Sequence, residues 1–384
     1  MPNLLHLSAD YPDSVSRKKP LAVANLLQAA PWATHRIVSL NRVVDPAASV
    51  PLRFDGRGVA ACRYFGLPYG VGLSWWMDRV AGQVLEALRH DAELPALVHA
   101  HKLTFEGLIA ARVAGELGVP YCVTVRGHTD HKVIAAKPGL RGRYRDILRR
   151  AGRVFYLAPW SLERLEQQLG MRLPEAILLP NICRELHCLH PPPAVATRFA
   201  SVFHFRSRRV KRIGTVMRAL RELRARGFDT GLDVIGAADA EELQAMEELA
   251  RGIGVADGVR AFRAMDAGEL GRRLPGYAGL VLPSYPETFG LAYVEALSAG
   301  IPVVHARNSG IDGYFSGEGV ALAVDHRSVA NLVAAMADLL EHQETYRNRV
   351  ASFVAAGGLR RFTEAEVGAL YRRALADLLS TSAA

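Results

Sequence analysis

The 384-residue chain lacks any long hydrophobic run: half of its residues are apolar, yet fifteen of them never occur in a row. A membrane-spanning helix needs about 20 such residues, so none is predicted. The first residues also lack a basic segment followed by an apolar stretch, which argues against a signal peptide. We therefore expect a cytoplasmic protein, and its length is sufficient for two domains with sizeable cores.

Cysteine is scarce as well. There are four cysteines, and only Cys183 and Cys188 lie close in sequence, at a spacing that matches no zinc motif. Cys62 is isolated, and Cys122 falls in an apolar run that is typical of a buried strand. We interpret all four as reduced thiols and predict no metal site from them.

Acidic residues are the minority among the charges: 38 Asp and Glu stand against 47 Lys and Arg, a net charge of +9. This excess favours anionic partners, namely nucleic acid, an anionic membrane surface or phosphorylated substrates. No basic-aromatic module for nucleic acid is present, so we predict no nucleic-acid partner. Much of the charge lies in residues 137–153 and 206–212. The first of these segments, with Trp75 and Trp76, is a candidate contact for an anionic membrane, or else ordinary solvated surface.

What the chain does contain is a regular alternation of short apolar runs and helix-like segments, which predicts right-handed βαβ units and parallel sheets. The alternation stops at residues 185–198, where three consecutive prolines indicate an interdomain linker. We therefore predict an α/β fold of two tandem Rossmann-like, doubly wound domains, residues 1–184 and 199–358. Ligands of such folds bind beyond the carboxyl ends of the strands, here in the cleft between the domains.

The segment "PSYPETFGLAYVEALSAGIPVV" follows one of these strands and holds two carboxylates with seven residues between them. Prolines keep Glu287 in the loop, and a helical pattern that resumes near Phe289 contains Glu295. The first N–H groups of such a helix attract anions, and Gly290 would let a phosphate approach the backbone. Because carboxylates accept hydrogen bonds from vicinal hydroxyls, the segment suits a sugar nucleotide. A helix cap and a surface charge would explain the two carboxylates equally well.

A second cationic segment, "HFRSRRVKR", follows the apolar run that begins at Phe199. Arg206 and Lys211 flank a loop that leads into a helix, where two cations would neutralise a diphosphate. They would also stabilise a nucleoside diphosphate as its charge grows on departure. A basic surface loop is the alternative interpretation.

These motifs resemble those of the family 4 glycosyltransferases, the retaining enzymes of the GT-B fold. The match includes the Glu-seven-residues-Glu pattern with Phe-Gly after the first Glu, and a Gly-x-Pro-Val strand beyond it. "FRSRRVKR" is similar to the family's Arg and Lys segment, with Phe205 and Arg212 where the family has glycine. "ILLPNI" is similar to a Pro-Asn-Gly strand end, with Ile182 in place of Gly.

The resemblance implies transfer of a hexose from a UDP- or GDP-linked sugar to a hydroxyl acceptor, with retention and without a metal or other cofactor. It also implies that the last helix, within residues 360–384, crosses back onto the N-terminal domain. Glu287 would bind donor-sugar hydroxyls and Glu295 the ribose. Arg206 and Lys211 would bind the diphosphate through their charges. Phe289, Gly290 and Leu291 would bind it through their backbone N–H groups.

The chain departs from the family pattern in its N-terminal half. The loop after the first strand lacks the family's glycine pair, and Ser16, which together with Pro20 could start the next helix, stands there with two cations. The family's histidine after the fifth strand is replaced by an arginine. The candidate contacts to donor sugar or acceptor are therefore Ser16, Arg17, Lys18, His101, Arg126 and His128.

The acceptor is expected to be lipid-linked or a saccharide, since many family members assemble cell-surface polysaccharides or glycolipids. Such an enzyme would associate peripherally with the membrane. The alternatives are a sugar-nucleotide epimerase, which shares the GT-B architecture, and a sugar-nucleotide-binding pseudoenzyme.

Overall fold

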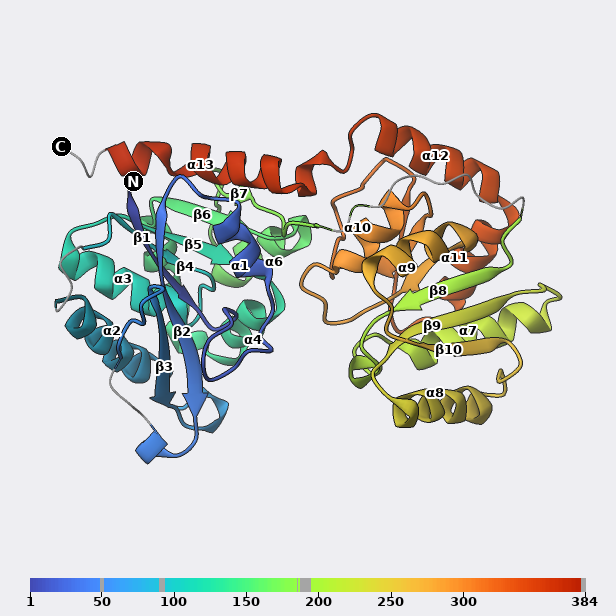
Figure 1. The fold of residues 1–384 in the computed structure, drawn as a ribbon, viewed down its shortest axis with the longest axis horizontal. Helices are drawn as coiled ribbons and strands as arrows, with labels where there is room; N and C mark the ends of the chain where they lie inside the picture. Colours follow the sequence, from blue (N-terminus) through green and yellow to red (C-terminus); the bar gives the residue numbers. More distant parts are fainter. Residues whose placement is uncertain (49–51, 90–93, 185, 187–194, 381–384) are drawn as a thin grey trace. The chain divides into compact units, whose positions relative to one another are not determined.

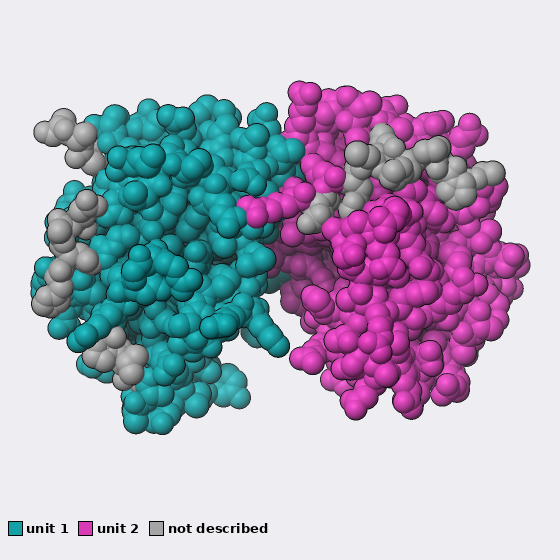
Figure 2. All heavy atoms as spheres, viewed as in Figure 1, with its two compact units in different colours: residues 1–157, 161–182, 362–384 teal, residues 158–160, 183–361 magenta. Residues whose placement is uncertain are grey.

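The computed structural model describes residues 1–48, 52–89, 94–184, 186 and 195–380. The chain divides into two compact units, shown in teal and magenta in Figure 2. Unit 1 comprises residues 1–157, 161–182 and 362–384, and unit 2 comprises residues 158–160 and 183–361.

Unit 1 is built on a seven-stranded parallel sheet in the order β3-β2-β1-β4-β5-β6-β7. Its strands are β1 (Asn3–Ser8), β2 (Thr34–Val43), β3 (Val59–Phe65), β4 (Leu97–Ala100), β5 (Tyr121–Val125), β6 (Arg153–Tyr156) and β7 (Ile177–Leu178). Its helices are α1 (Ala22–Gln28), α2 (Leu73–Arg89), α3 (Glu106–Leu117), α4 (His128–Ala136), α5 (Arg141–Arg150), α6 (Pro159–Leu169), whose first residues fall in unit 2, and α13 (Glu364–Ser380).

Both faces of this sheet are covered, because successive residues of a strand point to opposite faces. Leu5 and Leu7 of β1 join the cluster formed with α2, α3 and α5, whereas Leu4 joins the cluster formed with α1 and α13. Figure 1 shows α2 and α3 on one side of the sheet and α13 along the other. Burial on both faces explains why the strands are continuous apolar runs and not alternating ones.

Unit 2 repeats the plan with a six-stranded parallel sheet in the order β10-β9-β8-β11-β12-β13. Its strands are β8 (Arg198–Val202), β9 (Gly231–Ala237), β10 (Val259–Arg263), β11 (Gly279–Leu282), β12 (Val303–Ala306) and β13 (Ala321–Val324). Its helices are α7 (Ile213–Ala225), α8 (Ala240–Ile253), α9 (Ala267–Arg273), α10 (Leu291–Ser298), α11 (Val329–Glu341) and α12 (Gln343–Ala355).

The strand order reverses between β1 and β4 in unit 1 and between β8 and β11 in unit 2. Loops that follow strands on either side of such a reversal diverge, and ligands bind there in open α/β sheets. The prediction of two doubly wound Rossmann-like domains is therefore confirmed. Among the described helices, none is both long enough and apolar enough to cross a bilayer.

Several predicted boundaries differ from the structure. Residues 158–160 belong to unit 2, and the predicted linker ends inside β8, while residues 185 and 187–194 lie outside the described part of the chain. The helix expected from Ser16 and Pro20 begins only at Ala22, because Ser16 is held in the preceding loop by Asp13. Cys62, Cys122 and Cys183 are buried free thiols, and Cys188 is not described.

Candidate functional site

The centre of the candidate site in unit 2 is an ion pair between Lys211 and Glu287. Lys211 lies in the loop between β8 and α7, and Glu287 in the loop between β11 and α10. The Tyr285 N–H donates to the Val210 carbonyl at 2.9 Å, which ties the two loops together. Because the loops follow the two strands at the reversal of strand order, both charges lie where a ligand is expected.

A third loop, which follows β12, fixes the backbone of Glu287. The Ser309 hydroxyl accepts from the Glu287 N–H at 2.9 Å and donates to the Ser284 carbonyl at 2.9 Å. The Gly310 N–H donates to the Glu287 carbonyl at 2.9 Å, and the Trp160 indole N–H donates to the Gly310 carbonyl at 3.0 Å. The carboxylate is therefore held in place by its main chain.

The start of α10 depends on the absence of a side chain at Gly290. This residue has a φ of +84°, and an added Cβ would lie 2.4 Å from the ring of Tyr293. Tyr293 is buried, and its hydroxyl donates to the carbonyl of Leu282 at the end of β11. The helix begins at Leu291, so its N-terminal N–H groups and the positive end of its dipole face the loop that carries Glu287. Glu295 is half-buried in the helix itself.

In the loop after β8, Arg212 adopts a backbone conformation that is more typical of glycine. Arg212 has a φ of +56°, a left-handed conformation that costs an ordinary residue about 1–2 kcal/mol. It precedes α7 at the position where the family pattern has its second glycine. The resemblance therefore holds for the backbone at this point, although the residue type differs.

Arg206 does not join Lys211 in the structure. Its side chain is 82% exposed and its Nε lies 3.3 Å from Glu242 on α8. Lys211 is only 19% exposed and contacts Glu287. Of the two predicted cations, the structure thus brings Lys211 alone into direct contact with a predicted carboxylate.

In unit 1, His101 is the end of a chain of three hydrogen-bonded imidazoles. His35 Nε2 lies 2.9 Å from the Ala30 carbonyl, His35 Nδ1 lies 3.0 Å from His6 Nε2, and His6 Nδ1 lies 3.1 Å from His101 Nε2. His6 and His101 are fully buried. Burial is the main cause that lowers the pKa of each of the three, so they are neutral at pH 7.

Neutrality determines the direction of every hydrogen bond in this chain. A carbonyl only accepts, so the proton of His35 is on Nε2 and its Nδ1 accepts from His6. The same reasoning places the proton of His6 and of His101 on Nε2. His101 therefore presents a lone pair at Nδ1, an atom that is buried and has no partner among the described residues. It lines a small hollow together with Thr124, Arg126 and Asn181.

The ring nitrogens of His6, His99 and His101 lie within 4.8 Å of one another, a spacing at which a metal could be bound. His99 already uses both nitrogens, with the Tyr371 hydroxyl and the Thr124 hydroxyl each at 2.7 Å. Metal binding would break these contacts as well as the link between His6 and His101. The hydrogen bonds account for the cluster without a metal.

Arg126 is buried, and Asp130 and Asn181 hold it in place. Its Nη2 donates to the Asn181 side chain at 3.0 Å, and its backbone N–H donates to Asp130 at 3.1 Å. Gly127, with a φ of +94°, turns the chain into α4, whose first residue is His128. Burial lowers the pKa of His128 to about 4, so it is neutral at pH 7. His101 and Arg126 follow β4 and β5, and so share the carboxyl edge of the sheet.

The loop between β1 and α1 is organised by Asp13. Its carboxylate accepts from the Ser16 N–H at 2.7 Å, from Lys19 at 3.0 Å and from Asn41 at 2.7 Å. Burial opposes its ionisation, but the hydrogen bonds prevail and lower the pKa of Asp13 to about 2. Arg17 and Lys18 are exposed at the tip of this loop, available to an anion.

The sequence reasoning missed Glu106, the first residue of α3. Its carboxyl group is fully buried, and Oε1 accepts from the Ala9 N–H at 2.8 Å. Burial raises the pKa of Glu106 to about 7. It also missed Ser309 and Asp13, although each lies in a loop at the carboxyl end of a predicted strand. Their position after a predicted strand was the feature of the sequence that could have identified both residues.

Two successive parallel-sheet units with these loops are typical of the GT-B glycosyltransferases. Two family models match the chain, Glycosyl transferase 4-like domain over residues 21–181 and Glycosyl transferases group 1 over residues 194–352. Together they include the whole sheet of unit 2 and every strand of the sheet of unit 1 except β1. The chain belongs to this family of GT-B glycosyltransferases.

Curated relatives match over a shorter stretch. D-inositol 3-phosphate glycosyltransferase 2 from Catenulispora acidiphila is 31% identical over 136 residues, 35% of this chain and 32% of that protein. The GDP-mannose-dependent alpha-(1-6)-phosphatidylinositol monomannoside mannosyltransferase of Mycolicibacterium smegmatis is 32% identical over 143 residues, 35% of this chain and 37% of that protein. The chain thus aligns with about a third of the length of these relatives.

Solved structures match over the whole chain. Anabaena HepE, whose crystal structure contains UDP, superimposes with a TM-score of 0.68 at 14% identity, covering 98% of this chain and 100% of that chain. At this level of identity the likeness shows the fold.

Proposed function

We propose that the protein is a glycosyltransferase that moves a sugar, of hexose type, from a nucleoside diphosphate sugar to a hydroxyl acceptor with retention of configuration. The observation that carries this proposal is the contact of Lys211 with Glu287 beside the glycine-opened start of α10. A cation, a carboxylate and the N-terminal end of a helix at one point suit a ligand with a diphosphate and sugar hydroxyls.

In this proposal, the donor enters between two groups that pair with each other in its absence. Lys211 binds the diphosphate together with the backbone N–H groups of Phe289, Gly290 and Leu291, which lie just before and at the start of α10. Glu287 then accepts hydrogen bonds from the hydroxyls of the donor sugar. Glu295, in the helix itself, binds the ribose, and Arg206 leaves Glu242 to reach the phosphates.

The reaction follows from the charge that develops on departure. The bond between the anomeric carbon and the diphosphate oxygen breaks, and the electron pair goes to the phosphate. The acceptor hydroxyl forms the new bond from the same face and gives its proton to a phosphate oxygen of the leaving group. Lys211 lowers the barrier by stabilising the growing phosphate charge, and no metal or other cofactor is needed in this scheme.

Unit 1 supplies the remaining contacts to sugar or acceptor. His101 offers a lone pair to a hydroxyl, Arg126 and His128 offer donors at the same edge, and Ser16, Arg17 and Lys18 meet an anionic group at the β1 loop. The acceptor is lipid-linked or a saccharide, and the transfer would serve cell-surface polysaccharide or glycolipid assembly at a membrane surface.

The donor is linked to UDP or GDP. UDP is bound in the Anabaena HepE structure, and the Mycolicibacterium smegmatis relative is named as dependent on GDP-mannose. A thermal-shift panel of UDP, GDP and ADP sugars separates these bases, because a ligand that binds only the folded state raises its melting temperature.

The test uses variants of Lys211 and Arg206, with donor hydrolysis and nucleotide release as the readout. Lys211→Ala should reduce turnover about 100- to 1,000-fold, since a preorganised charge at the transition state has that effect. Arg206→Ala with Lys211→Ala should abolish it. Arg209→Gln removes an exposed charge from the same loop and is the matched control. Turnover in the double variant equal to that of the wild type would refute the assignment, and epimerisation of the donor without transfer would favour the epimerase alternative.

A further inference from the structure

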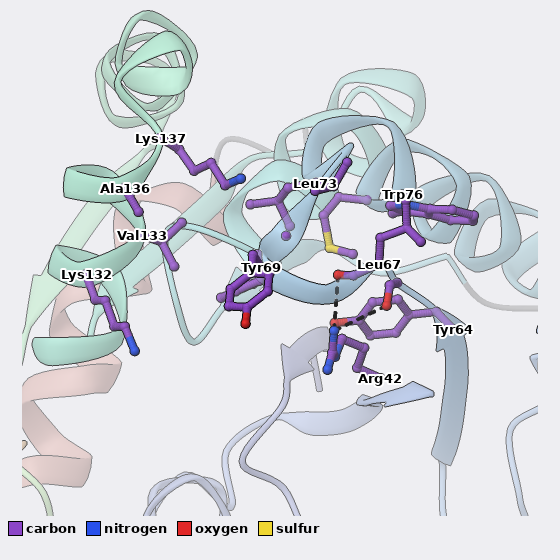
Figure 3. Close-up of a pocket in the computed structure, with 15 residues that line it drawn as sticks. Arg42, Tyr64, Leu67, Tyr69, Leu73, Trp76, Lys132, Val133, Ala136 and Lys137 are labelled. Atoms are coloured by element: carbon purple, nitrogen blue, oxygen red, sulfur yellow. Dashed lines mark hydrogen bonds between the residues drawn. The ribbon is translucent and has the colours of Figure 1, made fainter. Parts of the chain in front are cut away.

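Unit 1 contains a cavity of about 410 Å³ that the proposed donor chemistry does not use. It lies at the carboxyl ends of β2 and β3, between residues 66–73, the start of α2 and α4 (Figure 3). Small-molecule sites occupy roughly 300–1,000 Å³. The cavity therefore has the size of a ligand site and shares its edge of the sheet with His101 and Arg126.

The wall of this cavity is apolar and aromatic. Among the residues that line it are Tyr64, Leu67, Tyr69, Trp76, Phe105 and Val133. Arg42 on β2 donates to the carbonyls of Gly66 at 3.2 Å and Leu67 at 3.1 Å, which holds the loop open over the hollow. In Figure 3, Val133 and Ala136 face Tyr69 and Trp76 from the opposite side.

The rim carries positive charge only. Of the described residues that line the cavity, three are cations, namely Arg42, Lys132 and Lys137, and none is acidic. Lys132 lies on α4 and Lys137 directly follows it. Their ammonium groups form no hydrogen bond or ion pair with any residue that the structure describes. An apolar wall below unpaired ammonium groups is complementary to an amphipathic anion.

The apolar character continues outside the cavity. Tyr69 is 95% exposed, Val71 is 54% exposed and Trp75 is 55% exposed. Trp75 and Trp76 also line a second, smaller hollow of about 320 Å³, to which Tyr64 contributes as well. Exposed Tyr and Trp beside Lys and Arg are the composition of a surface that meets a lipid headgroup region.

We propose that this cavity is the acceptor subsite and that it takes a lipid-type acceptor, with the hydrocarbon against the aromatic wall and a phosphate at Lys132 and Lys137. The assignment of the cavity as an acceptor subsite rests on the proposed glycosyltransferase function. It selects the lipid-linked acceptor over the free saccharide, because the described lining is largely aliphatic and aromatic and contains no carboxylate, amide, Ser, Thr or His side chain for the many hydroxyls of a saccharide. The exposed Tyr69, Val71 and Trp75 then lie toward the membrane from which the lipid enters.

The proposal is tested by direct binding of n-alkyl phosphates of 4 to about 14 carbons, each below its critical micelle concentration, to the full-length protein. Burying one methylene should raise affinity about fourfold, and the gain should stop at the chain length that fills the cavity. Trp76 lies in the wall, so its fluorescence should change with the bound fraction. Inorganic phosphate is the comparison ligand without a hydrocarbon and should bind far more weakly.

Two neighbouring alanines provide a matched pair of variants. Ala136 lines the cavity, whereas Ala135, also exposed on α4, does not. Ala136→Trp should fill the hollow and remove the dependence on chain length, and Ala135→Trp should leave it unchanged.

The charge is tested with Lys132→Gln and Lys137→Gln. Each should weaken binding of alkyl phosphates about two- to fivefold and leave a neutral alkyl glycoside of equal chain length unaffected. Arg89→Gln removes a cation at the far end of α2, about 20 Å along the helix from Trp76. It should change neither the affinity for alkyl phosphates nor the affinity for the alkyl glycoside.

Affinity that rises with chain length without a plateau, equally in the wild type and in Ala136→Trp, would show adsorption to a general apolar surface and overturn the proposal. Inorganic phosphate binding as tightly as decyl phosphate would overturn it too, since the wall would then contribute nothing. Neither result depends on turnover. Donor hydrolysis by the same preparation tests the glycosyltransferase proposal separately, so a failure of one is distinguishable from a failure of the other.

Discussion

Replacement of Gly290 by alanine tests the site through its backbone, without a change in charge. Gly290 has a φ of +84°, and an added Cβ would lie 2.4 Å from the Tyr293 ring and 3.4 Å from Glu287 Cγ. The left-handed conformation costs an alanine about 1–2 kcal/mol. Overpacking against a buried ring costs about 1–3 kcal/mol more, because Tyr293 cannot move without losing its bond to the Leu282 carbonyl. We therefore expect a total loss of about 2–5 kcal/mol in the free energy of unfolding of unit 2.

Gly254 provides the control that separates the two contributions. It ends α8 in the same unit with a φ of +83°, and an added Cβ would meet no atom within 4 Å. Gly254→Ala should therefore show the conformational cost alone, about 1–2 kcal/mol. The excess of Gly290→Ala over Gly254→Ala isolates the packing against Tyr293.

The measurement is differential scanning calorimetry with and without UDP or GDP. For a domain of this size, each kcal/mol lowers the melting temperature by about 2–4 °C. Gly290→Ala should thus shift the transition of unit 2 by about 4–20 °C and abolish its stabilisation by the nucleotide, whereas Gly254→Ala should keep that stabilisation. Equal shifts in both variants, with nucleotide binding intact in both, would refute the reasoning about the start of α10.

Three further predictions concern unit 1. Burial raises the pKa of Glu106 to about 7 from an ordinary 4.5, so the stability contributed by its protonated form is complete below pH 4.5 and is lost as the pH rises through 7. The loss is about 3 kcal/mol, and urea unfolding from pH 5 to 8 should show it in the wild type and not in Glu106→Gln, while parallel pH profiles would contradict it. Hydrogen bonds lower the pKa of Asp13 to about 2, so its contribution is present above pH 3.8 and is lost as the pH falls through 2. Asp13→Asn should destabilise the protein by about 1–3 kcal/mol at pH 7 and by less at pH 2, measured by urea unfolding; an equal loss at both values would indicate that the charge is unimportant. Nitrogen-15 NMR should find His6, His35 and His101 protonated at Nε2 at pH 7, and a proton at Nδ1 of His101 would disprove the direction assigned to the imidazole chain.

The outline of the fold was accessible from sequence because its signals are local. Alternating apolar runs and helical segments predicted the parallel sheets, and the prolines around Glu287 placed it in a loop before α10. Gly290 was identified from the need for backbone space, and the structure shows that a Cβ there would strike Tyr293. These features depend on a few neighbouring residues each.

Other features of the site depend on contacts between distant segments. Arg206 and Lys211 are five residues apart, yet one contacts Glu242 and the other Glu287, because the 3-10 turn after β8 directs them differently. The helix that Ser16 together with Pro20 could start begins instead at Ala22, and Ser16 lies in the preceding loop, where its N–H group donates to Asp13.

The sequence by itself determined the fold class, the family and the positions of the loops that carry charge, because periodicity and motif spacing are properties of neighbouring residues. Only the tertiary structure decided how those charges pair and where space remains. His35 lies on β2, His6 on β1 and His101 directly after β4, and they acquire a common hydrogen-bond direction only once the sheet aligns these segments. The cavity in unit 1 exists because β2, β3, α2 and α4 meet around residues 66–73, and volume enclosed by distant segments has no signature in the order of residues.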